Sequence, residues 1–115
     1  MRTAPTIIAV FVVALAGVGC GEDCQSSCQK IYDPSECGIQ VGGKTSTELT
    51  RSCISECQDA LANTGPMGDY DPLTRRDPLN PKTLENEKQA AAWMDCVAEA
   101  SCEDLEPSTG GLCEH

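Results

Sequence analysis

The chain has 115 residues with 18 acidic and eight basic side chains, a formal net charge of −10, and nine cysteines. This length accommodates one small domain. The negative charge repels nucleic acid and anionic lipid headgroups, so we expect neither as a ligand. Nine cysteines in so short a chain are typical of oxidised, exported proteins and rare in a reducing cytoplasm.

Residues 1–19 predict a secretory signal peptide. Arg2 gives a positive start, and an unbroken apolar run, Ile7–Leu15, leads into small residues. As a helix, the stretch from Ile7 to Val18 would span only about 18 Å, against about 30 Å for the hydrocarbon core of a bilayer. We therefore predict export of a mature chain, residues 20–115, rather than a membrane-spanning segment.

Cys20 stands where the signal ends, and setting it aside leaves an even number of cysteines, eight, for four disulfides. The segment LAGVGC resembles the lipobox of bacterial lipoproteins, in which the cysteine is acylated and becomes the new N-terminus. This resemblance implies a lipid anchor on Cys20 in the bacterial outer membrane or periplasm. The family usually has Leu where this chain has Gly17, and cleavage after Ala14-Leu15-Ala16 would instead give a soluble secreted protein.

The mature chain is poor in apolar side chains, with only 12 Leu, Ile, Val and Phe residues after Cys20. Such a composition is typical of disorder unless crosslinks compensate. Each disulfide that closes a loop of about 15 to 100 residues adds roughly 3 to 5 kcal/mol of stability. We expect an all-α, disulfide-stapled domain of about three helices with a long Pro-rich loop, following the N-terminal signal helix. Without the disulfides, the alternative is a disordered acidic tether.

The first helix is expected from Glu22 to about Tyr32, with Pro34 as its stop. A loop, residues 33–44, contains Cys37 and precedes the second helix. Thr45 and Glu48 form a capping-box pattern at the start of that helix.

Four apolar residues recur every fourth position in the second helix and predict its buried stripe. They are Leu49, Cys53, Cys57 and Leu61, with Ala60 beside them. Asn63 and Gly65 are the expected stop signals.

Residues 64–81 contain four prolines and two glycines, which predicts an extended loop. We expect it to be dispensable for folding and to carry the recognition surface. Its candidate contact residues are Tyr70, Leu73, Arg75, Arg76 and Leu79. A third helix should begin at Pro81 or Thr83 and end at Ala100, with Trp93, Cys96 and Val97 on its buried side. Cys102 and the turn 107–111 follow it.

Two C-x3-C pairs are the strongest pattern in the chain. Residues four apart stack on one helix face, so two antiparallel helices can be joined by the parallel disulfides Cys24–Cys57 and Cys28–Cys53. The arrangement resembles the helical hairpins of small intermembrane-space chaperones and plant defence peptides. The wider layout, with its late W-x2-C-x5-C segment, resembles small Cys-rich lipoproteins of Gram-negative bacteria.

The other four cysteines pair most simply as Cys102–Cys113 across the turn and Cys37–Cys96. Eight cysteines allow 105 connectivities, so this assignment is one of several.

Residues Gly38–Thr45 match the nucleotide-binding pattern G-x4-G-K-[ST]. The preceding residues are polar and broken by Pro34, whereas a P-loop follows a buried apolar strand. We therefore predict a Gly-rich connection before a capped helix, and no bound nucleotide.

No motif predicts an enzyme or a cofactor. His115, the only histidine, is terminal and poorly placed as a catalytic base. The leading hypothesis is a lipid-anchored, non-enzymatic envelope protein that is structural or binds a macromolecule, such as another envelope protein. One alternative is a metal-binding or thiol-handling factor that uses the C-x3-C pairs, which requires reduced cysteines. Another is a secreted toxin- or inhibitor-like cystine peptide.

Overall fold

The computed structural model describes residues 23–75 and 83–113, and all regular secondary structure in these two ranges is helical. The predicted all-α, disulfide-stapled domain is confirmed, while the expected signal helix and Cys20 lie outside the described residues. The helices are α2 (Cys24–Tyr32), α3 (Ser46–Leu61), α4 (Glu87–Glu99) and α5 (Cys102–Leu105). None of these four is long and apolar enough to cross a membrane.

Side chains cap the first turn of each helix. In the predicted capping box of α3, Thr45 Oγ1 accepts a hydrogen bond from the Glu48 N–H at 3.1 Å. Glu48 Oε1 in turn accepts one from the Thr45 N–H at 2.9 Å. Similar boxes begin α2 and α5. Helix α2 ends at Tyr32, as predicted from Pro34.

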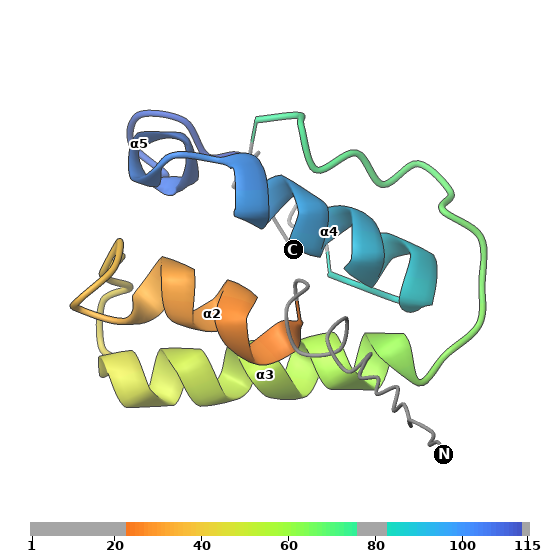
Figure 1. Cartoon of the computed structure of the whole chain (residues 1–115), viewed down its shortest axis with the longest axis horizontal. Coiled ribbons are helices and arrows are strands. Elements are labelled where there is room, and N and C mark those ends of the chain that lie inside the picture. The colour runs from red at the N-terminus through yellow and green to blue at the C-terminus, as the bar shows by residue number, and fades with distance from the viewer. Residues whose placement is uncertain (1–22, 76–82, 114–115) are drawn as a thin grey trace, which may run out of the picture.

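Helices α2 and α3 form an antiparallel hairpin joined by the two predicted disulfides (Figure 1). The Cα atoms of Cys24 and Cys57 are 5.7 Å apart, and those of Cys28 and Cys53 are 5.8 Å apart. Because the two bonds are one helical turn apart, they fix both the register and the spacing of the helices. Cys28 and Cys57 are fully buried.

The predicted apolar stripe of α3 is correct for its first three members and wrong for the fourth. Leu61 is 42% exposed, and Ala60 is buried in its place. A spacing of four residues exceeds the helical repeat of about 3.6, so each step drifts by about 40° around the helix. After three steps from Leu49 the side chain has left the buried face, whereas Ala60 has returned to it.

Helix α4 packs across the hairpin and completes the core. Its Trp93 and Val97 side chains are fully buried against both α2 and α3. Trp93 Nε1–H donates to the Cys113 carbonyl oxygen at 2.9 Å, so the indole is buried without an unsatisfied donor.

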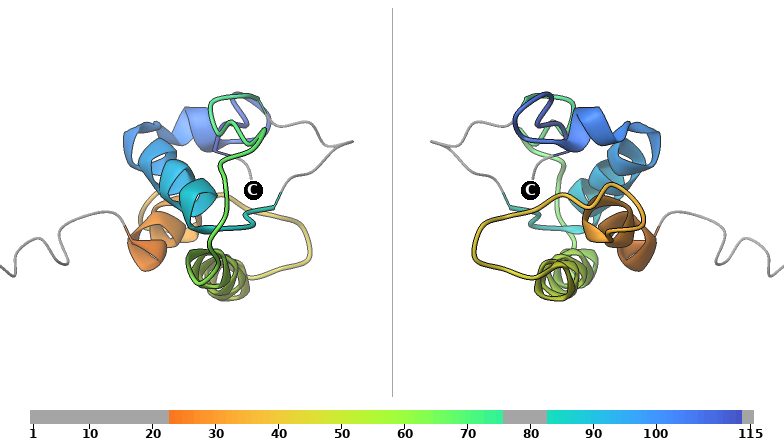
Figure 2. Two further views of the ribbon diagram at one scale, coloured as in Figure 1. Left: turned by 90° about the vertical axis from the view of Figure 1, so that its right-hand side faces the viewer. Right: turned by 90° about the vertical axis from the view of Figure 1, so that its left-hand side faces the viewer.

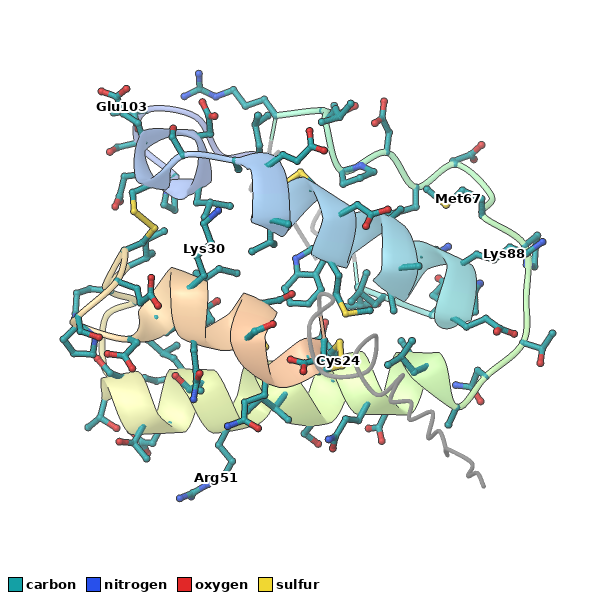
Figure 3. The ribbon with its side chains drawn as sticks, in the orientation of Figure 1. Cys24, Lys30, Arg51, Met67, Lys88 and Glu103 are labelled. Carbon is teal, nitrogen blue, oxygen red and sulfur yellow. A yellow bond between two sulfur atoms is a disulfide. The ribbon has the colours of Figure 1, made fainter. Side chains whose placement is uncertain are left out.

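A single lysine joins α2 to the C-terminal end of α4 (Figure 3). Lys30 Nζ donates to the carbonyl oxygens of Val97, Ala98 and Ala100 at 2.5, 3.2 and 2.6 Å. The last carbonyl groups of a helix lack hydrogen-bond partners within the helix. The Lys30 ammonium group donates hydrogen bonds to them, and its positive charge is also attracted to the negative end of the helix dipole.

Helix α4 begins later than expected, at Glu87 instead of Pro81 or Thr83. The Asn86 side chain caps it by accepting from the N–H groups of Lys88 and Gln89, each at 3.1 Å. Leu84, just before the cap, is buried in the core. The residues just before α4 are therefore held in place by the apolar contact of Leu84 and do not form a further helical turn.

The pairing of the last four cysteines differs from the prediction. The bonds are Cys37–Cys102 and Cys96–Cys113, with Cα separations of 5.2 and 5.6 Å. The turn after α5 does not return Cys113 to Cys102. Instead the Cys113 N–H donates to the Pro72 carbonyl oxygen at 2.8 Å, which brings the chain end beside α4. The short helix α5 was not predicted, and its first residue is bonded to the loop 33–44.

Replacing Lys30 by methionine retains the aliphatic stem and removes the ammonium group. We expect Lys30→Met to lower the free energy of unfolding by about 1.5 to 3 kcal/mol, as for other hydrogen bonds to charged groups. Guanidinium denaturation of the oxidised protein measures this value. Lys88→Met removes an exposed lysine on α4 and should change it by less than about 0.5 kcal/mol. Equal effects of the two substitutions would contradict the role given to Lys30.

Candidate functional site

The first half of the expected recognition loop is part of the fold. After α3 the chain runs along α4 (Figure 2), where Asn86 Nδ2–H donates to the Pro66 carbonyl oxygen at 2.9 Å. Gln89 Nε2–H donates to the Met67 carbonyl oxygen at 3.1 Å. Tyr70 is only 7% exposed and belongs to the core. Tyr70 is therefore a core residue and not the exposed contact residue expected from the sequence. These contacts favour a structural role for residues 66–70, against the expectation that the loop is dispensable.

Of the other candidate contact residues, two are exposed and two are not described by the structure. Leu73 is 70% exposed, and Arg75 is also exposed. Arg76 and Leu79 lie outside the described residues. The side-chain amides of Asn86 and Gln89 attach the loop to α4. Their burial would have indicated this role, but in the sequence alone both look like ordinary polar residues of a helix.

All eight cysteines that follow Cys20 are joined in disulfides. A disulfide sulfur offers no thiolate for a metal ion or for thiol exchange as a nucleophile. Within residues 23–75 and 83–113, no group of three His, Cys, Asp or Glu side chains is arranged to hold a metal ion. His115 lies outside this part of the chain.

The segment that matches the nucleotide-binding pattern connects two helices. It follows α2 rather than a strand, and its Ile39 is buried, with the Ile39 N–H donating to the Ile31 carbonyl oxygen at 2.8 Å. Thr45 and Glu48 are engaged with each other in the α3 cap. Because a carboxylate already accepts the Thr45 N–H, a phosphate approaching this helix end would meet negative charge.

Among the described residues, three carboxyl groups have lowered pKa values, and each of them serves local structure. The Ser26 backbone N–H lowers the pKa of Asp23, and the Ser35 backbone N–H lowers the pKa of Asp33. The pKa of Glu48 is lowered mainly by the Thr45 backbone N–H. Perturbed pKa values often mark catalytic sites, but these groups lie at helix caps and at a turn.

Two open grooves cross the surface of the described chain. One, of about 470 Å³, lies between α2 and α3 and is lined mainly by polar side chains such as Gln29, Thr50 and Gln58. The other, of about 450 Å³, lies between α4, the end of the loop after α3, and the segment that follows α5. Its wall is mainly apolar and includes Leu73. This second groove, called here the α4 groove, is the stronger candidate for a binding site.

The fold and its surfaces define a small helical protein held by four disulfides. Comparisons with models of known protein families, with curated proteins and with solved structures found no match for this chain.

Tyr70 and Leu73 should differ sharply in their effect on stability. We expect Tyr70→Ala to lower the free energy of unfolding by about 3 kcal/mol, because it removes a buried aromatic ring. Leu73→Ala should change it by less than about 0.5 kcal/mol, since the side chain is mostly in solvent. Denaturation of the oxidised proteins measures both values. A stable Tyr70→Ala variant would show that the loop does not support the core.

The Glu48 cap should contribute to stability only while its carboxyl group is ionised. Its pKa in the folded chain is below the ordinary value of 4.5, so the contribution is present above that value and is lost as the pH falls through the folded pKa. We expect the wild-type chain to be more stable than Glu48→Gln at about pH 6, and the difference to shrink toward about pH 3. Denaturation midpoints across this range measure the difference. Glu36→Gln, an exposed change outside the caps, should show no such trend.

Proposed function

We propose that the chain is a lipid-anchored, non-enzymatic protein of the bacterial cell envelope that acts by binding another macromolecule. The observation that carries the proposal is the complete pairing of the eight cysteines after Cys20. This pairing leaves Cys20 without a cysteine partner within the chain, at the end of the predicted signal. A thioether-linked lipid would account for the odd cysteine.

The spacing between Cys20 and the fold limits how far an anchored domain could lie from the bilayer. Only three residues separate Cys20 from Cys24, which begins α2 and is bonded to Cys57. An extended chain advances at most about 3.6 Å per residue, so the Cα atoms of Cys20 and Cys24 can be at most about 14 Å apart. In this proposal the end of the hairpin that carries Cys24–Cys57 is held close to the bilayer.

A binding role accounts best for the surfaces of the described chain. Its perturbed carboxyl groups are used in caps and a turn, its thiols are used in crosslinks, and its grooves are open. Metal binding or thiol handling, the first alternative, would require reduction of the bonds that hold the hairpin. A secreted toxin- or inhibitor-like peptide, the second alternative, differs from the proposal by the absence of lipid.

An intact mass of the native protein tests the anchor. The full chain, expressed with export in a Gram-negative host, should begin at Cys20, carry acyl chains there and lack the eight hydrogens lost in four disulfides. Cys20→Ser should be unacylated, with the same four disulfides. An unacylated wild-type chain that starts before or after Cys20 would overturn the anchor. Alkylation of any cysteine after Cys20 without prior reduction would overturn the crosslinked scaffold.

A further inference from the structure

The α4 groove combines an apolar wall with an exposed leucine. Its apolar lining includes Pro72 and Leu73 of the loop after α3, Ala92 of α4, and Leu112 of the segment after α5. Leu73 is the most exposed of the large hydrophobic side chains in the described residues. An exposed apolar side chain beside a hollow of about 450 Å³ offers an anchoring contact for a partner.

Carboxylates flank this apolar wall. Asp95 and Glu99 are four residues apart, so both lie on the groove face of α4, and Asp104 adds a third carboxylate from α5. No lysine or arginine is among the described residues that line the groove. The groove therefore combines an apolar surface with a negative potential.

The fold itself does not explain two of these acids. Acidic side chains stabilise the first turn of a helix, and they are disfavoured near its negative C-terminal end. Glu99 is the last residue of α4, and Asp95 is one turn before it. Asp104, by contrast, caps α5 by accepting the Ser101 N–H at 3.2 Å. Asp95 and Glu99 are exposed and cap no helix, so their charges are accessible to a ligand.

We propose that the α4 groove binds a basic, leucine-bearing polypeptide segment of a partner protein. The apolar wall with Leu73 would take an aliphatic side chain, and Asp95 and Glu99 would pair with lysine or arginine on either side of it. Exposed charge pairs contribute modestly to affinity and increase the rate of association. The inference rests on the proposed binding role and gives the chemical class of the partner.

Two other occupants fit the groove less well. A membrane surface with anionic headgroups would be repelled by the three carboxylates. None of the residues that line the groove belongs to α2 or α3, the hairpin that carries Cys24. A second copy of this chain would bring a further net charge of −10 to an acidic surface.

The test uses residues 21–115, exported behind a cleavable secretory signal and oxidised, so that no lipid is attached and no detergent is needed. Cys20 takes part in none of the four disulfides. The probe is a short synthetic peptide of Lys, Leu and Gly. One matched peptide has Glu in place of every Lys, and another has Gly in place of every Leu. Calorimetry gives the dissociation constant, and backbone amide NMR shifts locate the contact.

Two groove variants and one control variant separate the contributions of charge and of apolar contact to peptide binding. Asp95→Asn with Glu99→Gln removes the charges at nearly constant shape, and Leu73→Ser removes the apolar contact. The control, Glu36→Gln with Asp59→Asn, removes two exposed acids that do not line the groove.

We expect the Lys–Leu–Gly peptide to shift amides around Ala92 and Leu112, and each groove variant to weaken its binding about fivefold or more. The control variant should bind as the parent does, and both matched peptides should bind more weakly. Equal loss in the groove and control variants would overturn the proposal in favour of general charge attraction. Self-association of the parent that Leu73→Ser abolishes would assign the groove to a second copy.

The result is independent of lipid attachment, because the tested chain has no acceptor cysteine at position 20. Failure of the peptide to bind would overturn the groove proposal and leave the anchor unaffected. An unacylated native protein would overturn the anchor and leave the groove proposal unaffected.

Discussion

Two disulfides one helical turn apart hold α2 against α3, and the other elements depend on this joint. The chain has too few branched apolar residues to hold two short helices by hydrocarbon contact alone. Sulfur supplies both the crosslink and part of the core, since Cys28 and Cys57 are fully buried. Trp93 and Val97 of α4 then pack on a surface whose geometry is already fixed by covalent bonds. The large aromatic ring has a rigid partner, which a loosely associated hairpin would not provide.

Directed polar contacts attach the rest of the chain to this core. Lys30 holds the end of α4, while Asn86 and Gln89 hold the loop that runs beside it. The attached loop ends in Pro72 and Leu73, which line the α4 groove together with residues of α4 such as Ala92 and Asp95. The contacts that hold the loop therefore also place one part of the groove lining.

Patterns confined to a few residues could be predicted from the sequence, and arrangements that depend on distant segments could not. The Thr45–Glu48 cap and the pairs Cys24–Cys57 and Cys28–Cys53 follow from spacing within helices. The bond from Cys96 to Cys113 depends on the course of the chain after α5. There a Cβ at Gly110 would lie only 2.3 Å from the Asp104 carbonyl oxygen, a close approach that no local pattern signals. The burial of Tyr70 and the groove likewise require α4 as a neighbour.

The connectivity of the crosslinks has a consequence for biogenesis. In chain order the paired cysteines are 24, 28, 37, 53, 57, 96, 102 and 113, and no native bond joins two that are consecutive in this order. A polypeptide oxidised while it emerges N-terminus first would meet neighbouring thiols before the correct ones arrive. The native set then requires exchange of the early bonds through mixed disulfides. Maturation of this small domain would therefore depend on a compartment that rearranges disulfides as well as forming them.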